Sequence, residues 1–317
     1  MIKQWDLADD AAVAGMYEVN VAVSIVDDPG APIFTPRLFR GWLARGWNDD
    51  AREVWFMPGV GWYRLQLPEP ENRDRAYLDL MVAPAARRRG HGSELLEHAI
   101  GRAAANGRSL VRGWAWEWSP GEAFALARGG SHDITDIRRV QDISTAPRGA
   151  AVESGYSLVT WTGRAPEEVL AGLAGLYSAM ADAPHSEGNE SRVWDAARVR
   201  AADDLQVVFG TREYSVAARH NASGELAALS QVGVDPEDPE WGYQEITAVI
   251  RAHRGHRLGL AVKSAMLDLL IPAEPRLRRI VTNNSETNKH MIAVNEALGY
   301  EVFGPPMKNY RISVKEP

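Results

Sequence analysis

The chain has 317 residues, more than one ordinary hydrophobic core accommodates, so two domains of about 150 residues each are expected. Its net charge is −7 and 45% of its residues are hydrophobic, which predicts a globular protein without a nucleic-acid partner. The acidic balance is compatible with a cationic small substrate. The sequence contains no cysteine, which excludes disulfides, thiolate zinc sites and an acyl-cysteine intermediate.

Membrane and metal sites are not expected either. No apolar run reaches the roughly 20 residues of a membrane span, and residues 1–6 show no signal-peptide core, so a cytoplasmic protein without a membrane partner is predicted. His253 and His256 share a turn, but no third ligand is spaced to join them, so no metal site is predicted.

The first half of the chain has the patterns of four helices and four strands. Thr35 and Pro36 mark a helix start, as N-cap and first-turn residue. In chain order we expect helices at 5–20 and 35–46, a strand hairpin at 53–57 and 61–67, a strand at 77–82, a helix at 93–106, a strand at 109–116 and a helix at 121–128.

The second half repeats this order. We expect a strand at 156–161, helices at 166–181 and 194–200, strands at 213–219, 225–234 and 243–249, a helix at 259–270, a strand at 279–282, a helix at 287–298, and strands at 300–303 and 310–314. The pattern predicts an α+β fold with two tandem domains, 1–150 and 151–317. Each would hold a mixed, mostly antiparallel sheet flanked by helices.

A loop rich in glycine and arginine joins a strand to a helix in each half. Glycines let the backbone approach a ligand, the new helix exposes N–H groups, and arginines add positive charge, so each loop is predicted to bind a diphosphate. The first loop comprises Val82, Arg87, Arg88, Arg89, Gly90, His91, Gly92 and Ser93. The second comprises Thr247, Val249, Arg254, Gly255, His256, Arg257, Leu258, Gly259, Leu260 and Ala261.

These loops resemble a known family. The pattern Arg87-x-x-Gly90-x-Gly92 after a strand is similar to the acyl-CoA-binding loop of the GCN5-related N-acetyltransferases (GNATs). The run from Asn288 to Tyr300 is similar to the last helix of that family. Two such copies resemble the tandem architecture of mycothiol synthase, although no motif points to the substrate of that enzyme. The resemblance implies two GNAT-like domains that use acetyl-CoA as acyl donor.

The resemblance also implies roles for single residues. The strand before each loop would separate from its neighbour, so that residues 80–82 and 247–249 meet the pantetheine arm and the thioester. Strand alternation places Tyr243, Glu245, Thr247 and Val249 on one face, and a carboxylate on this strand often acts as base in the family. Glu245 is therefore the candidate catalytic base. The alternative is a structural carboxylate, paired with an arginine or exposed at an edge.

Other positions depart from the family or have two interpretations. Asn288 either caps its helix or contacts the coenzyme. Arg257 replaces the first glycine of the loop, and Asn295 replaces a tyrosine that in the family resembles a general acid. In the first copy, the register of Glu245 is occupied by Leu78.

Together these features predict an acetyl-CoA-dependent N-acetyltransferase whose second domain is catalytic. The acceptor would be an amine of a small molecule that attacks the thioester directly. A cationic amine such as an aminoglycoside, a polyamine or a basic metabolite fits the acidic balance. The alternative is a non-catalytic acyl-CoA-binding sensor or scaffold with degenerate sites. A third hypothesis keeps the fold but replaces acetyl-CoA with a longer acyl-CoA as donor. No oligomeric state is predicted.

Overall fold

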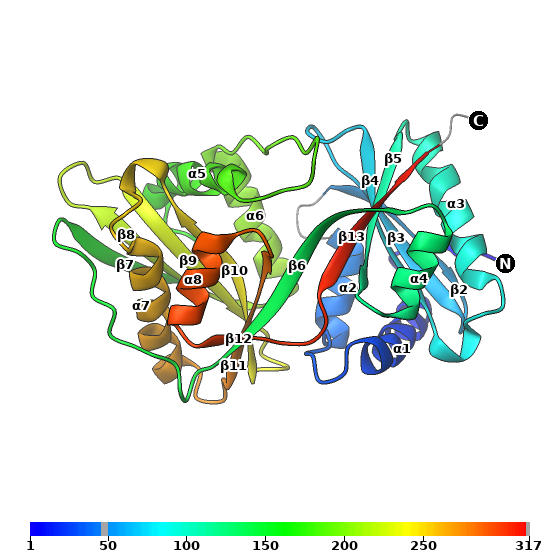
Figure 1. The fold of residues 1–317 in the computed structure, drawn as a ribbon, viewed down its shortest axis with the longest axis horizontal. Coiled ribbons are helices and arrows are strands. Elements are labelled where there is room, and N and C mark those ends of the chain that lie inside the picture. The colour runs from blue at the N-terminus through cyan, green and yellow to red at the C-terminus, as the bar shows by residue number, and fades with distance from the viewer. Residues whose placement is uncertain (46–49, 315–317) are drawn as a thin grey trace. The chain divides into compact units, whose positions relative to one another are not determined.

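The computed structural model describes residues 1–45 and 50–314 and divides the chain into two compact units (Figure 1). The first unit contains residues 1–136, 186–190 and 304–317, and the second contains residues 137–185 and 191–303. The chain therefore passes from the first unit to the second, returns to the first for residues 186–190, enters the second again, and returns to the first at residue 304.

The first unit is a sheet covered by helices on both faces. Its elements are β1 (Lys3–Gln4), α1 (Asp10–Asp27), α2 (Pro36–Arg45), β2 (Ala51–Met57), β3 (Gly61–Leu67), β4 (Arg75–Val82), η1 (Pro84–Ala86), α3 (His91–Ala105), β5 (Leu110–Trp116), α4 (Pro120–Ala127), the first half of β6 (Ser131–Asp142) and β13 (Met307–Ser313). The strand order is β1-β2-β3-β4-β5-β13-β6, and β4 and β5 run parallel.

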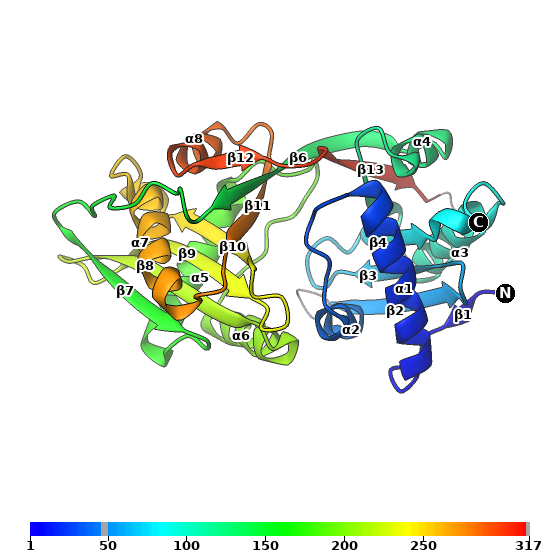
Figure 2. The same cartoon turned by 90° about the horizontal axis from the view of Figure 1, so that it is seen from below.

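Apolar side chains fill both faces of the first sheet, and β3 is buried on each. Trp62 packs with Phe39 of α2 and Met16 of α1, whereas Tyr63 packs with Leu95 of α3. Figure 2 shows α1 lying across the strands of this sheet. The loop before α3 begins at the carboxyl end of β4, after Val82.

The second unit has the same layered build. Its elements are the rest of β6, then β7 (Tyr156–Thr162), η2 (Glu167–Val169), α5 (Leu170–Ser178), η3 (Ala179–Asp182), α6 (Ala196–Phe209), β8 (Arg212–His220), β9 (Leu226–Val234), β10 (Trp241–Val249), η4 (Arg251–His253), α7 (Leu258–Ala273), β11 (Arg279–Ser285), α8 (Lys289–Ala297) and β12 (Tyr300–Val302). The strand order is β6-β11-β10-β9-β8-β7, with β12 paired to β6.

Each face of the second sheet has its own core. Leu173 of α5 and Val199 of α6 pack with Leu229 on one face. On the other face, Val262 of α7 packs with Val232. Because successive residues of a strand point to opposite faces, the face on which a β10 side chain lies is decided by its register.

Most predicted elements are present, with shifted ends. The helix expected at 5–20 spans Asp10–Asp27, because the Asp9 side chain accepts a hydrogen bond from Ala12 N at 2.9 Å and so caps it. The helix expected at 35–46 begins at Pro36, as predicted; its expected last residue lies outside the described residues. β6 has no counterpart among the predicted elements.

The units differ from the predicted halves because strands cross between them. β13, the last strand, pairs with β5 and with the first half of β6, although it belongs to the second half of the sequence. The short segment 186–190 also belongs to the first unit, where Asn72 and Glu190 exchange backbone and side-chain hydrogen bonds of 2.6–2.9 Å. The division into copies 1–150 and 151–317 stays a prediction about the repeat.

Lys263 of α7 is a charged residue in the interior of the second unit. It is 3% exposed, and its Nζ lies 4.4 Å from the centre of the Tyr300 ring. Among the described residues, Nζ has no hydrogen-bond partner. Burial lowers the pKa of Lys263 to about 7, because the interior disfavours the charged form.

Lys263→Met is expected to raise the free energy of unfolding by roughly 1–4 kcal/mol at neutral pH, because it removes an unpaired buried charge. Wild-type Lys263 titrates at about 7 when folded, whereas the ordinary value is 10.5, so wild-type stability should increase between these pH values. The advantage of the variant should therefore shrink in alkali. Urea unfolding near pH 7 and near pH 10.5 measures the stability difference between the variant and the wild type, with the exposed Lys289→Met as control. Equal stability of Lys263→Met and wild type at neutral pH would contradict the prediction.

Candidate functional site

In each unit, two neighbouring parallel strands separate along their length. β4 pairs with β5 only at residues 75–77, although it continues to Val82. β10 pairs with β11 only at residues 241–243, although it continues to Val249. Each separation opens directly before the predicted loop. The strand ends expected to meet a pantetheine arm therefore lie where β4 and β5, and β10 and β11, are no longer paired.

The two loops have the same backbone conformation. In the first loop Arg88 and Gly90 have φ values of +63° and +87°, and in the second Gly255 and Arg257 have +92° and +54°. Left-handed backbone occurs at the same two positions, but glycine and arginine have exchanged places. A non-glycine residue there costs roughly 1–2 kcal/mol. Arg257 therefore changes the residue type without changing the course of the loop.

Each loop ends at the N-terminus of a long helix. α3 begins at His91 and α7 begins at Leu258, and the first N–H groups of a helix have no intrahelical acceptor. The second glycine of each loop packs on the strand before it: a Cβ on Gly92 would lie 3.8 Å from Val82, and one on Gly259 would lie 3.6 Å from Val249. Each loop, together with the helix start that follows it, forms what we call a cradle. Both cradles present backbone N–H groups and a helix dipole to an anion.

The first arginine of each loop binds a carboxylate of its own unit. Arg87 makes a two-point ion pair with Asp27 at 2.7 and 2.8 Å and donates to Val82 O at 3.1 Å. Arg254 similarly binds Asp182 at 2.6 Å and Val249 O at 3.4 Å. In the structure these guanidinium groups hold each loop against the strand before it and against the last residue of α1 or η3. A phosphate contact would then fall to the backbone and to the exposed Arg88, Arg89 and Arg257.

The remaining loop residues have varied surroundings. His256 contacts Glu153 at 3.0 Å, and Ser93 accepts a hydrogen bond from Arg128. Leu258, Gly259 and Ala261 are buried residues, and His91 and Leu260 are half-buried. Asn288 caps α8 by accepting from Met291 N at 3.3 Å, so its capping role is present in the structure, while a coenzyme contact stays a prediction.

Glu245 lies at a β-bulge. The residues that follow it therefore point to the opposite face of the sheet from the predicted one. It is the extra residue between the pairs Gln244–Val232 and Ile246–Gln231. The bulge changes the alternation, so Ile246 and Ala248 pack towards α5 and α6, whereas Val249 packs towards α7. The prediction that Glu245, Thr247 and Val249 share a face is therefore wrong.

The carboxylate of Glu245 lies on the α5–α6 face. One of its oxygens is 3.4 Å from the position that a Cβ on Gly233 of β9 would occupy. The residue is exposed to solvent, yet the protein packed around the carboxylate desolvates it and raises the pKa of Glu245 to about 7. A base with this pKa is ionised in part at neutral pH and accessible to an amine.

A buried polar network lies beside Glu245. The Nε2 group of Gln231 donates to Glu213 at 2.8 Å and to Ser215 at 3.1 Å, and the hydroxyl of Tyr177 donates to Gln231 at 2.9 Å. Sequence reasoning missed these residues. A signal exists for Gln231, which follows Ser230 in the otherwise apolar strand at 226–234, whereas the strand at 212–220 is rich in polar residues and does not single out Glu213.

The corresponding strand of the first unit has no such base. Leu78 is buried, and the neighbouring Asp79 is bound by Arg64 at 3.1 Å and by the Trp114 indole at 3.0 Å. β4 pairs with β3 without a register shift, so no bulge turns a side chain outward. Asp79 is thus a structural carboxylate.

Two buried polar atoms near the separated strands of the second unit fit a coenzyme with amide groups. Thr247 Oγ1 on β10 and Asn295 Oδ1 on α8 have no hydrogen-bond partner among the described residues. The amide nitrogen of Asn295 donates to Asn284 of β11 at 2.7 Å. A buried polar atom without a partner is costly, and the amides of a pantetheine arm can supply one.

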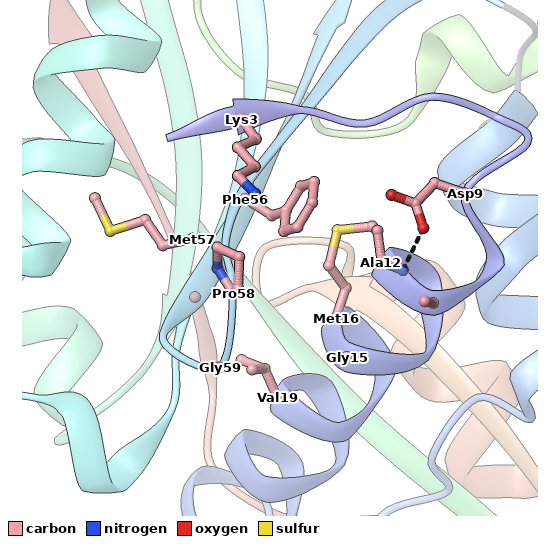
Figure 3. A pocket seen from close by; sticks show the side chains of 12 residues that line it. Lys3, Asp9, Ala12, Gly15, Met16, Val19, Phe56, Met57, Pro58 and Gly59 are labelled. Atoms are coloured by element: carbon pink, nitrogen blue, oxygen red, sulfur yellow. Dashed lines mark hydrogen bonds between the residues drawn. The ribbon is translucent and has the colours of Figure 1, made fainter. Parts of the chain in front are cut away.

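A cavity of about 280 Å³ in the first unit lies apart from these residues. It is bounded by α1, β1 and the turn between β2 and β3, and Figure 3 shows Met16, Val19, Phe56 and Met57 on its walls. Asp9 at its edge already caps α1. None of the predicted site residues lines it.

Residues 42–116 match the model of the acetyltransferase (GNAT) family. This segment contains β2 to β5 and the first loop. No curated protein sequence matches the chain. Among the described residues, no helix is long and apolar enough to cross a membrane.

Solved structures resemble the whole chain. A tandem GNAT protein from the clavulanic acid biosynthesis pathway, determined without AcCoA, has a TM-score of 0.85 and 28% identity over 99% of this chain and 98% of that chain. A GCN5-related N-acetyltransferase from Sphaerobacter thermophilus has a TM-score of 0.71 and 13% identity, over 99% of this chain and 96% of that chain. A GCN5-related glucosamine N-acetyltransferase region of a fungal multi-domain β-N-acetylglucosaminidase has a TM-score of 0.68 and 14% identity, over 98% of this chain and 38% of that chain. The last two show the fold alone.

Proposed function

We propose that the chain is a tandem GNAT acyltransferase whose second copy transfers an acetyl group from acetyl-CoA to an amine of a small molecule, with Glu245 as base. The observation that carries this proposal is the β10 bulge. It places an accessible carboxylate with a raised pKa on the strand that leads to the second cradle.

The second unit would hold the donor along the opening between β10 and β11. The diphosphate would lie on the N–H groups at the start of α7, with Arg257 adding charge. The pantetheine amides would contact the backbone of residues 247–249, Thr247 Oγ1 and Asn295 Oδ1. This arrangement leaves the thioester near the bulge.

The transfer then requires two proton movements and one substitution. Glu245 accepts a proton from the protonated amine, and the lone pair freed on the neutral amine attacks the thioester carbonyl carbon. A C–N bond forms, the C–S bond breaks, and its electron pair leaves with sulfur. The second amine proton passes to the departing thiolate as the amide forms, so the products are the amide, the free thiol and a protonated Glu245. The acidic balance favours a cationic acceptor.

A non-catalytic coenzyme-binding role fits the first copy better. Its cradle has the same backbone as the second, but buried Leu78 and ion-paired Asp79 occupy the strand where a base would stand. This copy would bind acetyl-CoA or support the fold without transfer. Screening small amines for release of free thiol from acetyl-CoA separates a transferase from a sensor for the chain as a whole.

Gly255→Ala is expected to raise KM for acetyl-CoA about tenfold, because alanine is strained by roughly 1–2 kcal/mol at a φ of +92°, so binding the coenzyme must restore a conformation that the free loop avoids. In the wild type, acetyl-CoA at 100 times Kd should stabilise the fold by about 2.7 kcal/mol. Differential scanning fluorimetry with and without acetyl-CoA should show a smaller shift for this variant.

Gly224→Ala is the matched control, since Gly224 has a φ of +76° in the turn between β8 and β9. It carries a similar strain and should lower Tm without changing the coenzyme-induced shift. Should acetyl-CoA leave the Tm of the wild-type chain unchanged at saturating concentration, the coenzyme assignment is wrong.

A further inference from the structure

Glu213 of β8 is a buried carboxylate that the transfer step does not use. It is 7% exposed and pairs directly with Gly233 of β9. Directly opposed residues on antiparallel strands have Cβ positions about 5 Å apart. A Glu245 oxygen lies 3.4 Å from the Cβ position of the same glycine. The missing side chain at Gly233 therefore leaves a gap with one carboxylate on each side.

The network around Glu213 fixes one of its oxygens. The Gln231 amide donates one hydrogen to Glu213 Oε1 and the other to Ser215, while its carbonyl accepts from Tyr177. Burial raises the pKa of Tyr177, which keeps the phenol protonated as the donor. The amide orientation is thus determined by both neighbours, and Glu213 Oε2 is the oxygen that can carry a proton.

The groups facing this pair are mostly acidic. α6 contributes Asp203, bound to Arg200 at 3.2 Å, and β10 contributes Tyr243 together with Glu245. Burial, with the charges of Glu245 and Asp203, raises the pKa of Glu213 to about 8. Two carboxylates this close titrate as a coupled pair, so a single proton is shared over an interval of pH.

We propose that Glu213 is a positioning residue for Glu245: the pair holds one proton, and Glu213 donates it, directly or through one water, to keep the Glu245 carboxylate oriented towards the acceptor amine. The inference rests on the proposed role of Glu245 as base. During turnover Glu245 gains the proton of the amine, and the pair returns it to solvent after the amide leaves.

The pH profile of kcat/KM with one acceptor tests the proposal. In the wild type, activity should rise through the first ionisation of the pair and fall through the second, when Glu213 loses its proton. Glu213→Gln keeps an N–H donor but cannot ionise, so it should retain the rise and lose the fall. Glu213→Leu should lower kcat about tenfold or more, the loss expected for a hydrogen bond to a charged group, with KM for acetyl-CoA unchanged. A falling limb in Glu213→Gln equal to that of the wild type overturns the proposal, as does a wild-type kcat in Glu213→Leu.

Carbon-13 NMR of labelled glutamate carboxyls tests the pair without turnover. Both residues should titrate in two steps in the wild type. Glu245→Gln should lower the pKa of Glu213, because it removes a neighbouring negative charge. Independent one-step titrations would refute the shared proton even where no acceptor releases thiol. If the coupling is present and no amine is acetylated, the transferase assignment fails instead.

Discussion

Glu245→Gln is expected to lower kcat roughly 10²- to 10⁴-fold, the usual contribution of a general base, with little change in KM for acetyl-CoA. The amide fills the same space at the β10 bulge but cannot accept the amine proton. Since desolvation of its carboxylate raises the pKa of Glu245 to about 7, wild-type activity should increase as pH rises through that value. The variant should lose this dependence. Thiol release measured across pH at saturating acetyl-CoA gives both quantities.

Glu240→Gln is the matched control for this change. Glu240 is an exposed carboxylate just before β10, outside the site, so its neutralisation should leave kcat and the pH profile as they are. Activity of Glu245→Gln within threefold of the wild type would remove Glu245 from the mechanism and favour the structural interpretation of this carboxylate.

Tyr310→Ala is expected to reduce the free energy of unfolding of the first unit by about 3–5 kcal/mol, the range for loss of a buried aromatic ring. Tyr310 is 4% exposed on β13, opposite Gly113 of β5 and His132 of β6, and its hydroxyl donates to Glu122 at 2.9 Å. Removing the ring opens the middle of this sheet. Urea unfolding measures the loss, and hydrogen exchange of β5 amides locates it.

Tyr310→Phe separates the ring from its hydroxyl. It keeps the packing and loses the hydrogen bond to Glu122, so a cost of about 1 kcal/mol is expected. The amides of β8, in the other unit, should exchange at wild-type rates in both variants. If β5 exchanges no faster in Tyr310→Ala, β13 does not hold the first sheet together.

Local patterns predicted much of each unit. Alternating strands, the Thr35–Pro36 helix start and the repeated loop all depend on neighbours a few residues apart, so the sequence reveals them. The loop pattern even anticipated the equivalence of the two cradles. The left-handed φ shared by Gly90 and Arg257 required coordinates, because only glycine announces such a conformation in a sequence.

The candidate base was predicted as a residue, but its surroundings were not. Glu245 was selected from its strand, yet the bulge that turns it towards α5 and α6 has no period-two signature and reverses the expected face of Thr247. Glu213 could not be predicted as a site residue, because it lies near Glu245 only by virtue of strand pairing. Both residues are next to Gly233, which lies on a third strand.

The sequence by itself determined most of the elements, their repetition and the chemical character of the loops, because propensity, periodicity and turn residues act over short separations. Tertiary structure decided that β13 completes the sheet of the first unit, that Arg87 and Arg254 bind carboxylates, and that Glu213 and Glu245 both lie next to Gly233. These features depend on which strands pair and in what register, and pairing between residues far apart in the chain is settled by the packing of the whole unit.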